Sequence, residues 1–578
     1  MPGSGEFRRF LADSVEHRQK VTAYLPRLYS SFGGRVSTGE KSAHRAELSA
    51  EQTSLFILLV ACVAHYWICL TLTSEIALDV DPINLLYGMH EFNIAHHAPH
   101  PPGYWVYVWM LRGLHAVVGG DPFASVQLLA RLMSTATIPL IYLAVRLLRP
   151  SDAFAAGFAA ILAAFHPFLI FHGVDAQTHT SEAFAAALLL VVVVCYRRHP
   201  AIGWAAASGA ALALGSAFRP SFIVAGIGPI VWAIGFRRFL HLSVAGAVSI
   251  VGALAWVLPT FEASGGREQW RAAHDALVEQ TFVRTSSPFS GEAIMEFVLY
   301  SVLSTAFWLL LALAPAIVAM LARRGSLNPP DDAYRDARAI AFWSAAPSVV
   351  FYLSMFCSEP GYLLGFIPMV IAATALAATP DLPNKTRRLT LALAALTQLA
   401  ILMMPGAFNY VGKVPSIPEL VHREVVYRTV LERMAEKIPP DARILYVTDY
   451  PDIVLSRQLP VLHPKLHAMI IHSEYWPGFD DTCIGYATQD DWIPIPGPIL
   501  LQPGPETIAE MPYVYDFVVV DPLSSPDLRD ELRRHTRCDV GSIEDADAEV
   551  PVLPARECFT NAVIEVHGQG VRFQLPEG

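Results

Sequence analysis

The chain has 578 residues, of which 53% are hydrophobic and only 16% are charged, and its mean hydropathy is +0.39. Soluble domains carry about 25% charged residues, so this composition excludes an ordinary soluble protein and indicates a polytopic membrane protein. The net charge of -11 argues against a nucleic acid partner, because nucleic-acid-binding surfaces are basic.

The first 50 residues are hydrophilic and rich in arginine, and they predict a cytoplasmic arm. The first apolar run follows, at about 53–72, and it has the length of a membrane span. Further apolar segments lie near 126–145, 153–171, 181–196, 201–217, 221–235, 240–259, 297–321, 339–356, 361–378 and 389–405. We therefore predict an all-α polytopic membrane domain over 51–408, with about eleven transmembrane helices.

Basic residues occur in every second connection between these segments. They are Arg146 and Arg149, Arg197 and Arg198, Arg237 and Arg238, Arg323 and Arg324, and Lys385, Arg387 and Arg388. The positive-inside rule places these connections and the N-terminal arm in the cytoplasm. The opposite, external face then receives a first loop at 73–103, a second at 260–296 and the C-terminal region. An alanine- and arginine-rich composition with few lysines suggests a bacterial inner membrane protein.

The region 409–578 has a different composition and predicts a small α/β domain outside the cytoplasm. Pro418–Lys437 has the pattern of an amphipathic helix, and Arg443–Val447 and Tyr515–Asp521 are short apolar runs typical of buried strands. Disulfides are permitted in that compartment, and one pairing open to this domain joins Cys538 to Cys558.

The first external loop concentrates ionisable and proline residues between two apolar segments. Asp81-Pro82 predicts a helix start, with the aspartate as N-cap and the proline at the first helical position. We expect an interfacial helix whose apolar side lies in lipid and whose polar side faces a cavity. The apolar side comprises Leu85, Leu86, Met89 and Phe92, and the polar side comprises Asn84, Tyr87 and Glu91.

The carboxylates and histidines of this loop are candidates for catalysis. Asp81 can take a proton from an incoming hydroxyl or amine, with Asp79 as the alternative base, or it can be a helix cap with no further role. The four histidines are His90, His96, His97 and His100. No i, i+4 histidine pair combines with a carboxylate here, so hydrogen-bonding histidines are favoured over a divalent metal site, which stays an alternative.

The order of these features resembles the GT-C glycosyltransferases. An acidic residue follows the first span, then come an interfacial helix and the sequence H-P-P-G-Y, which ends at Tyr104. This is most similar to the protein O-mannosyltransferase and aminoarabinose-transferase branch. Two departures stand out: Asp81-Pro82 replaces the family's acidic pair, so the second acid is lost or supplied by Asp79, and Gly103 replaces the usual leucine.

The resemblance continues over about residues 53–378. A-R-L-M-S-T contains Arg131, the turn after F-H-P-F-L-I-F-H contains Asp175, Arg219 follows a span of small residues, and E-P-G-Y-L-L-G-F-I-P contains Tyr362. The resemblance implies an enzyme that transfers a sugar from a polyprenyl-phosphate or polyprenyl-diphosphate lipid, with inversion, to an external acceptor.

Further expectations about residues follow from the resemblance. Asp81 or Asp79 would be the base, and the donor phosphate would be neutralised by external arginines and tyrosines, as arginine suits phosphate geometrically. The candidates for substrate binding are Glu91, His100, Tyr104, Arg131, Asp175, Arg219, Arg267, Arg271 and Tyr362. No cofactor is indicated with certainty, a divalent metal is an alternative that is not favoured, and the acceptor is a protein, lipid or glycan.

Several of these candidates also have a purely structural alternative. Arg131 can pair with Asp175, which can equally be a helix cap, and Arg219 can extend its side chain to the membrane surface from a helix end. Arg267 and Arg271 have the spacing of one solvated helix face, and Tyr362 suits the aromatic belt at a membrane interface.

Two other functions are open at this point. A transporter or flippase of lipid-linked glycans would show charges within its spans or inverted repeats, whereas the sequence has few charges in the middle of its spans and no inverted repeat. An assembly scaffold working through the C-terminal domain would tolerate substitutions in the first external loop.

Overall fold

The computed structural model describes residues 38–94, 98–277, 331–355, 360–377, 384–404 and 416–448, together with short stretches within 303–321 and 455–574. It divides the chain into residues 1–54 and residues 55–578. In the first unit the described part is the beginning of α2 (Thr38–Thr71).

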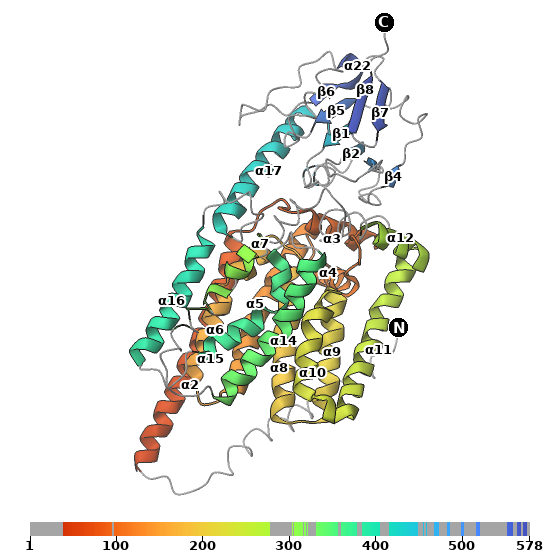
Figure 1. Ribbon diagram of the computed structural model, residues 1–578. Helices are drawn as coiled ribbons and strands as arrows, with labels where there is room; N and C mark the ends of the chain where they lie inside the picture. The colour runs from red at the N-terminus through yellow and green to blue at the C-terminus, as the bar shows by residue number, and fades with distance from the viewer. Residues whose placement is uncertain are drawn as a thin grey trace, which may run out of the picture. The chain divides into compact units, whose positions relative to one another are not determined.

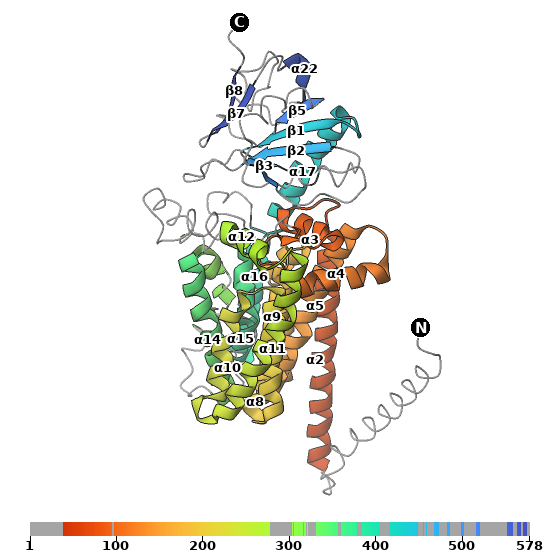
Figure 2. The ribbon, with the colours of Figure 1, turned by 90° about the vertical axis from the view of Figure 1, so that its right-hand side faces the viewer.

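A helical bundle accounts for most of the described residues (Figure 1). After α2 come α3 (Val80–His90), α4 (Trp105–Val118), α5 (Pro122–Leu148), α6 (Ala153–Ala164), α7 (Pro167–Val174), α8 (His179–Arg198), α9 (Ile202–Phe218), α10 (Phe222–Ile234), η3 (Phe236–Arg238), α11 (Phe239–Ala263), α12 (Arg267–Leu277), α14 (Asp332–Met355), η6 (Pro360–Gly365), α15 (Ile367–Ala377) and α16 (Asn384–Leu402). The helices α3, α4 and α12 lie at one end of the bundle in both ribbon views (Figures 1 and 2).

Four described helical stretches are long and apolar enough to cross a membrane: Ala50–Thr71, Pro122–Leu148, His179–Arg198 and Phe236–Ala263. The pair α6 and α7, bent by 45° at its break, adds a fifth if it is one span. The chain is therefore an integral, multi-pass membrane protein. The expected total of about eleven spans stays a prediction, and the segment 297–321 lies partly outside the described residues.

Small residues allow these helices to approach closely. A Cβ atom on Gly209 of α9 would lie 2.2 Å from the carbonyl oxygen of Ala245 in α11, so only glycine permits this packing. Helix starts are fixed by side chains: Asp121 caps α5, which has a proline in its first turn, and Asp152 caps α6.

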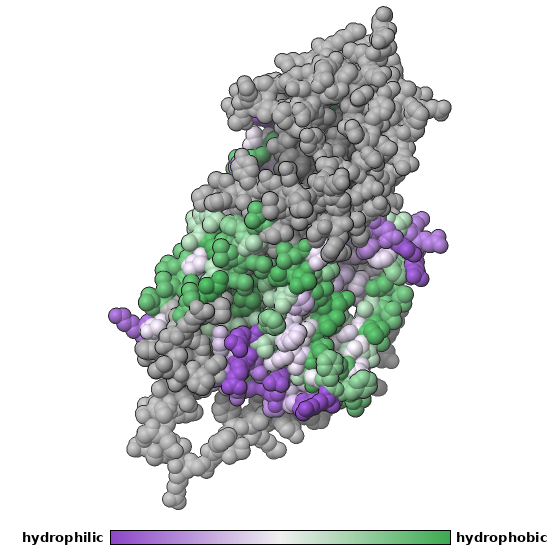
Figure 3. Space-filling model, in the orientation of Figure 1, coloured by the Kyte–Doolittle hydropathy of each residue, from purple (hydrophilic) through white to green (hydrophobic). Residues whose placement is uncertain are grey.

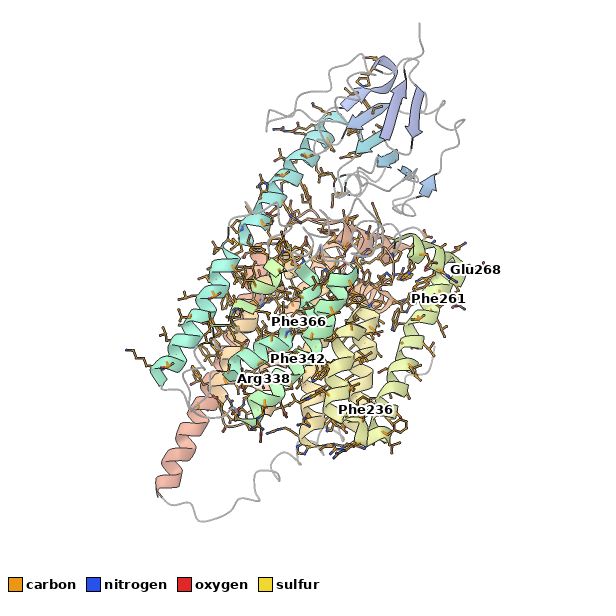
Figure 4. The ribbon with its side chains drawn as sticks, viewed as in Figure 1. Phe236, Phe261, Glu268, Arg338, Phe342 and Phe366 are labelled. Carbon is orange, nitrogen blue, oxygen red and sulfur yellow. The ribbon has the colours of Figure 1, made fainter. Side chains whose placement is uncertain are left out.

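The outer surface of the bundle is apolar. Figure 3 shows hydrophobic side chains across the middle of the visible face and hydrophilic ones gathered near its ends. Exposed residues on it include Leu254 of α11 and Leu393, Leu396 and Leu399 of α16. Phe236 lies near one end of α11, with Phe261 and Glu268 near the other (Figure 4). A lipid environment removes the cost of exposing such a surface to water.

The short helix α3 differs from our expectation in two ways. Its N-cap is Asp79, not Asp81: the Asp79 carboxylate accepts a hydrogen bond from the backbone N–H of Asp81 at 3.2 Å. Its apolar residues do not lie in lipid, because Leu85, Leu86 and Phe92 are buried within the protein, where α3 packs against α4 and α5.

The described part of the C-terminal region contains a helix and a mixed sheet. The helix α17 (Ile417–Lys437) is followed by β1 (Arg443–Thr448), β2 (His467–His472), β3 (Cys483–Gly485), β4 (Ile499–Leu501), β5 (Phe517–Val520), β6 (Val552–Pro554), α22 (Ala555–Cys558), β7 (Val563–His567) and β8 (Gly570–Gln574). One sheet has the order β2-β1-β5-β6, with β1 parallel to β2 and β5 and with β6 antiparallel to β5. Cys558 is disulfide-bonded, whereas Cys538 lies outside the described residues.

Candidate active site

The two aspartates of the first external loop have different tasks. Asp79 is 4% exposed and caps α3, so its carboxylate is committed to the helix start. Asp81 lies in the first turn, where the helix dipole favours a negative charge. Its Oδ1 atom is 3.3 Å from Nδ1 of His100, which makes Asp81 the aspartate directed at the H-P-P-G-Y segment.

Asp81, His100 and Tyr104 form a chain of polar contacts. His100 contacts Asp81 through Nδ1, and its Nε2 lies 2.8 Å from the hydroxyl oxygen of Tyr104. Burial raises the pKa of the Tyr104 phenol above its usual range, so this hydroxyl keeps its proton and donates it to Nε2. Nδ1 of His100 faces the Asp81 carboxylate, and the side-chain amide nitrogen of Asn84 lies 3.5 Å from the same atom.

Two further features fix the backbone around Asp81, His100 and Tyr104. Arg112 of α4 donates hydrogen bonds to the carbonyl oxygens of Gly88 and Met89, which tie the end of α3 to α4. Gly103 has φ +114°, and a Cβ atom there would lie 2.4 Å from Cδ1 of Ile94. Glycine is required at this position, which explains the departure from leucine in physical terms.

A second group of polar residues surrounds Arg219, which ends α9. The guanidinium is 7% exposed, and its NH1 group donates to Oγ1 of Thr178 at 3.1 Å and lies 3.5 Å from Nε2 of His179. Its Nε atom is 3.8 Å from Oε2 of Glu182. Because Arg219 is buried among these groups, it does not extend its side chain to the membrane surface.

Tyrosine rings enclose the same guanidinium. The Cζ atom of Arg219 lies 4.6 Å from the ring centroid of Tyr362 and 5.9 Å from that of Tyr104. Tyr362 in turn stacks on Tyr352 of α14, with a centroid distance of 4.7 Å. Tyr104 therefore belongs to both groups: its hydroxyl bonds His100 and its ring contacts Arg219.

Two glycines in η6 allow this segment to approach α8 closely. A Cβ atom on Gly361 would lie 2.3 Å from ring atoms of His179, and one on Gly365 would lie 2.9 Å from Oε1 of Glu182. Without side chains at these two positions, η6 packs directly on the first turn of α8 and brings Tyr362 over Arg219.

The sequence predicted some of this group and missed the rest. It predicted Asp81, His100, Tyr104, Arg219 and Tyr362, which the structure brings together. It missed Thr178, His179, Glu182 and Tyr352. A signal for Glu182 was present, since this carboxylate opens an otherwise apolar span, where ionisable residues are costly and usually functional.

Arg131 and Asp175 are buried, but their described contacts do not join them to Arg219. Arg131 donates to Oγ1 of Thr73 at 2.7 Å, which links α5 to the residues after α2. Asp175 is the C-cap residue of α7.

The remaining predicted residues lie on the surface. Glu91 is the exposed C-cap residue of α3. Arg267 and Arg271 lie on α12, where Arg271 is exposed and forms an ion pair with Asp275 one helical turn away, at 3.2 Å. Arg267 and Arg271 thus lie on a solvated face of α12, which was the structural alternative to a role in substrate binding.

Over the described ranges, no group of three or more His, Cys, Asp or Glu side chains is arranged to hold a metal ion. His96 and His97 lie outside those ranges.

Comparisons with known proteins now add to this geometry. Residues 99–261 match the family model described as dolichyl-phosphate-mannose-protein mannosyltransferase. No curated protein sequence matches the chain.

Among solved structures, ArnT from Cupriavidus metallidurans in the apo state is similar with a TM-score of 0.54 at 15% identity, over 88% of this chain and 98% of that one. The same enzyme bound to undecaprenyl phosphate gives 0.48 at 15% identity, over 72% and 85% of the two chains. The oligosaccharyltransferase of Archaeoglobus fulgidus gives 0.42 at 13% identity, over 81% and 69%.

The match over residues 99–261 supports the resemblance to the mannosyltransferase family, and the chain shares its fold with ArnT. The matched segment contains His100, Tyr104, Glu182 and Arg219, so the candidate site lies largely inside it.

Proposed function

We propose that this membrane glycosyltransferase of the GT-C type transfers a sugar from a polyprenyl-phosphate lipid to a hydroxyl or amine on the external face of the membrane. The observation that carries the proposal is the contact chain from Asp81 through His100 to Tyr104, whose ring borders the buried guanidinium of Arg219. This chain places a candidate base and a candidate phosphate ligand in one connected group.

Asp81 acts as the general base. His100 contacts this carboxylate and orients it, and in this role the carboxylate takes the proton of an acceptor hydroxyl. The deprotonated acceptor attacks the anomeric carbon, the bond from that carbon to the phosphate oxygen breaks, and the polyprenyl phosphate leaves with the electron pair. A single displacement of this kind inverts the anomeric configuration.

Arg219 binds the donor phosphate. A guanidinium presents several N–H donors in a plane, which suits phosphate oxygens, and its low exposure strengthens the attraction. The ring of Tyr362 lies against the guanidinium, and the ring of Tyr104 borders it as well, so both rings help to hold Arg219 in position.

The compartment and the architecture belong to the same proposal. The basic residues Arg149, Arg197 and Arg238 lie at the ends of α5, α8 and η3, and the candidate site lies at the beginning of α8 and the end of α9. With the basic ends in the cytoplasm of a bacterium, the site opens on the external face of the inner membrane. About eleven spans over 51–408 and an external α/β domain over 409–578 complete this arrangement.

The test is sugar transfer by purified protein in liposomes that contain a labelled polyprenyl-phosphate sugar. Asparagine retains the capping ability of aspartate but accepts no proton, so Asp79→Asn and Asp81→Asn separate the cap from the base. We expect Asp79→Asn to remain active and Asp81→Asn to lose transfer while staying folded. Equal transfer by both variants and the wild type would show that Asp81 is not the base, whereas a wild type without any transfer would favour a transporter or a scaffold.

A further inference from the structure

Glu182 is a buried carboxylate that the proposed mechanism does not use. Its side chain is 1% exposed, and it lies in the first turn of α8, beneath Gly365 of η6. Its Oε2 atom is 3.8 Å from Nε of Arg219 and 3.8 Å from Nδ1 of His179. The first turn of a helix is a favourable place for an anion.

The contact between Glu182 and Arg219 is loose for an ion pair. A charge-assisted hydrogen bond between nitrogen and oxygen is about 2.7–2.9 Å long, whereas this distance is 3.8 Å. The position of the guanidinium is set instead by Thr178, at 3.1 Å, and by the ring of Tyr362. Glu182 therefore balances the charge of Arg219, whereas Thr178 and Tyr362 fix the position of its guanidinium.

A buried guanidinium needs a compensating charge, because transfer of an unpaired charge into the protein is costly. Three tyrosines and a histidine also border Arg219 or its neighbours: Tyr104, Tyr352, Tyr362 and His179. Glu182 is the carboxylate that the described contacts place against Arg219. A donor phosphate at Arg219 would bring a second anion close to the first, and the two would repel.

We propose that Glu182 is the internal counter-ion of Arg219 and competes with the lipid phosphate for it. The inference rests on the proposed function, since it assigns the phosphate to Arg219. Glu182 stabilises the empty site and weakens the binding of both the donor and the polyprenyl phosphate product. The enzyme thereby holds a buried cation ready without retaining the product, whose phosphate carries more negative charge than the donor.

The test measures the affinity of undecaprenyl phosphate for the purified full-length protein in detergent, together with the thermal stability of the protein. Glu182→Gln keeps the shape of the side chain and removes its charge. We expect the lipid to bind about tenfold more tightly to this variant, as one like-charge repulsion is removed. We also expect the free variant to be less stable than the wild type and to gain more stability from the lipid.

Asp152→Asn is the matched control. Asp152 is a buried carboxylate that contacts a buried arginine, Arg149, at 3.4 Å, and it lies between α5 and α6, away from the described contacts of Arg219. Asparagine retains its capping bond to Ala155. This variant should lose stability without a change in lipid affinity.

The outcomes separate the two claims. A wild-type protein that binds no undecaprenyl phosphate overturns the assignment of the phosphate to Arg219 and thus the proposed function. A wild type that binds it, with Glu182→Gln binding equally or more weakly, overturns only the counter-ion role. If Glu182→Gln does not fold, Glu182→Asp takes its place: its retracted carboxylate should tighten lipid binding by a smaller factor, and unchanged or weaker binding would refute the role.

Discussion

At the scale of single residues, Tyr104 connects the two halves of the site. Its hydroxyl contacts His100 and its ring borders Arg219, so the two functions can be separated by one substitution. A phenylalanine retains the ring and removes the hydroxyl.

For Tyr104→Phe we expect the turnover of sugar transfer to fall by about tenfold, because His100 loses the hydrogen bond at Nε2 that fixes its tautomer. Tyr107→Phe is the control, since Tyr107 is also fully buried and its hydroxyl has no hydrogen-bond partner among the described residues. Steady-state kinetics with saturating donor measure both variants. A Tyr104→Phe enzyme as active as Tyr107→Phe would remove Tyr104 from the mechanism.

Arg219→Lys tests the guanidinium without removing its charge. Lysine retains the positive charge but has no planar guanidinium to lie against the ring of Tyr362 while it donates to Thr178, so its contacts differ in geometry. We expect KM for the lipid donor to rise by about tenfold or more, with a smaller effect on kcat. An unchanged KM would show that the phosphate binds elsewhere.

The sequence could predict Asp81, His100 and Tyr104 because they lie within one loop of the chain. It could not predict that Glu182, Arg219 and Tyr362 meet, since α8, the end of α9 and η6 are brought together only by helix packing. It also assigned the helix cap to Asp81 because Asp-Pro is a typical start signal. In the structure the preceding Asp79 takes that role and leaves Asp81 for His100.

At the scale of elements, α3 shows why an amphipathic pattern does not identify what covers its apolar side. Leu85, Leu86 and Phe92 require apolar surroundings, and both lipid and protein supply them. Packing against α4 and α5 provides protein, so α3 is a fixed part of the site. Only the three-dimensional arrangement separates the two possibilities.

The element η6 gives a direct prediction. Gly361→Ala places a methyl group where the ring of His179 lies, so η6 must move away from α8 and withdraw Tyr362 from Arg219. We expect a loss of transfer of at least about tenfold with unchanged helix content by circular dichroism.

The control for that prediction is Gly113→Ala on α4, where a Cβ atom meets nothing within 4 Å. Alanine in an exposed helix should stabilise the protein slightly, by about 0.5–1 kcal/mol, and leave transfer unaffected. If both alanine variants were equally active, the close packing of η6 on His179 would not matter for activity.

At the scale of the whole molecule, the account requires that the two ends of the bundle face different compartments. Phe236 is 79% exposed in η3, beside the basic residues Arg237 and Arg238, whereas Glu268 is exposed on α12 (Figure 4). The positive-inside rule assigns the first end to the cytoplasm and the second to the external face.

Single cysteines at these positions test the assignment. In intact cells, a membrane-impermeant maleimide should label Glu268→Cys and not Phe236→Cys, whereas permeabilised cells should show both. The unsubstituted protein gives the background from the native cysteines. Labelling of Phe236→Cys alone in intact cells would invert the topology and put the candidate site in the cytoplasm.

The central claim is that Asp81 performs the proton transfer while Arg219 holds the donor. It is tested most directly by a single-turnover experiment on Asp81→Asn, with labelled polyprenyl-phosphate sugar already bound and acceptor then added. We predict that the donor binds as it does to the wild type and that its sugar is transferred about 10²–10⁴-fold more slowly, the usual contribution of a general base. Transfer at the wild-type rate from the bound donor would contradict the account.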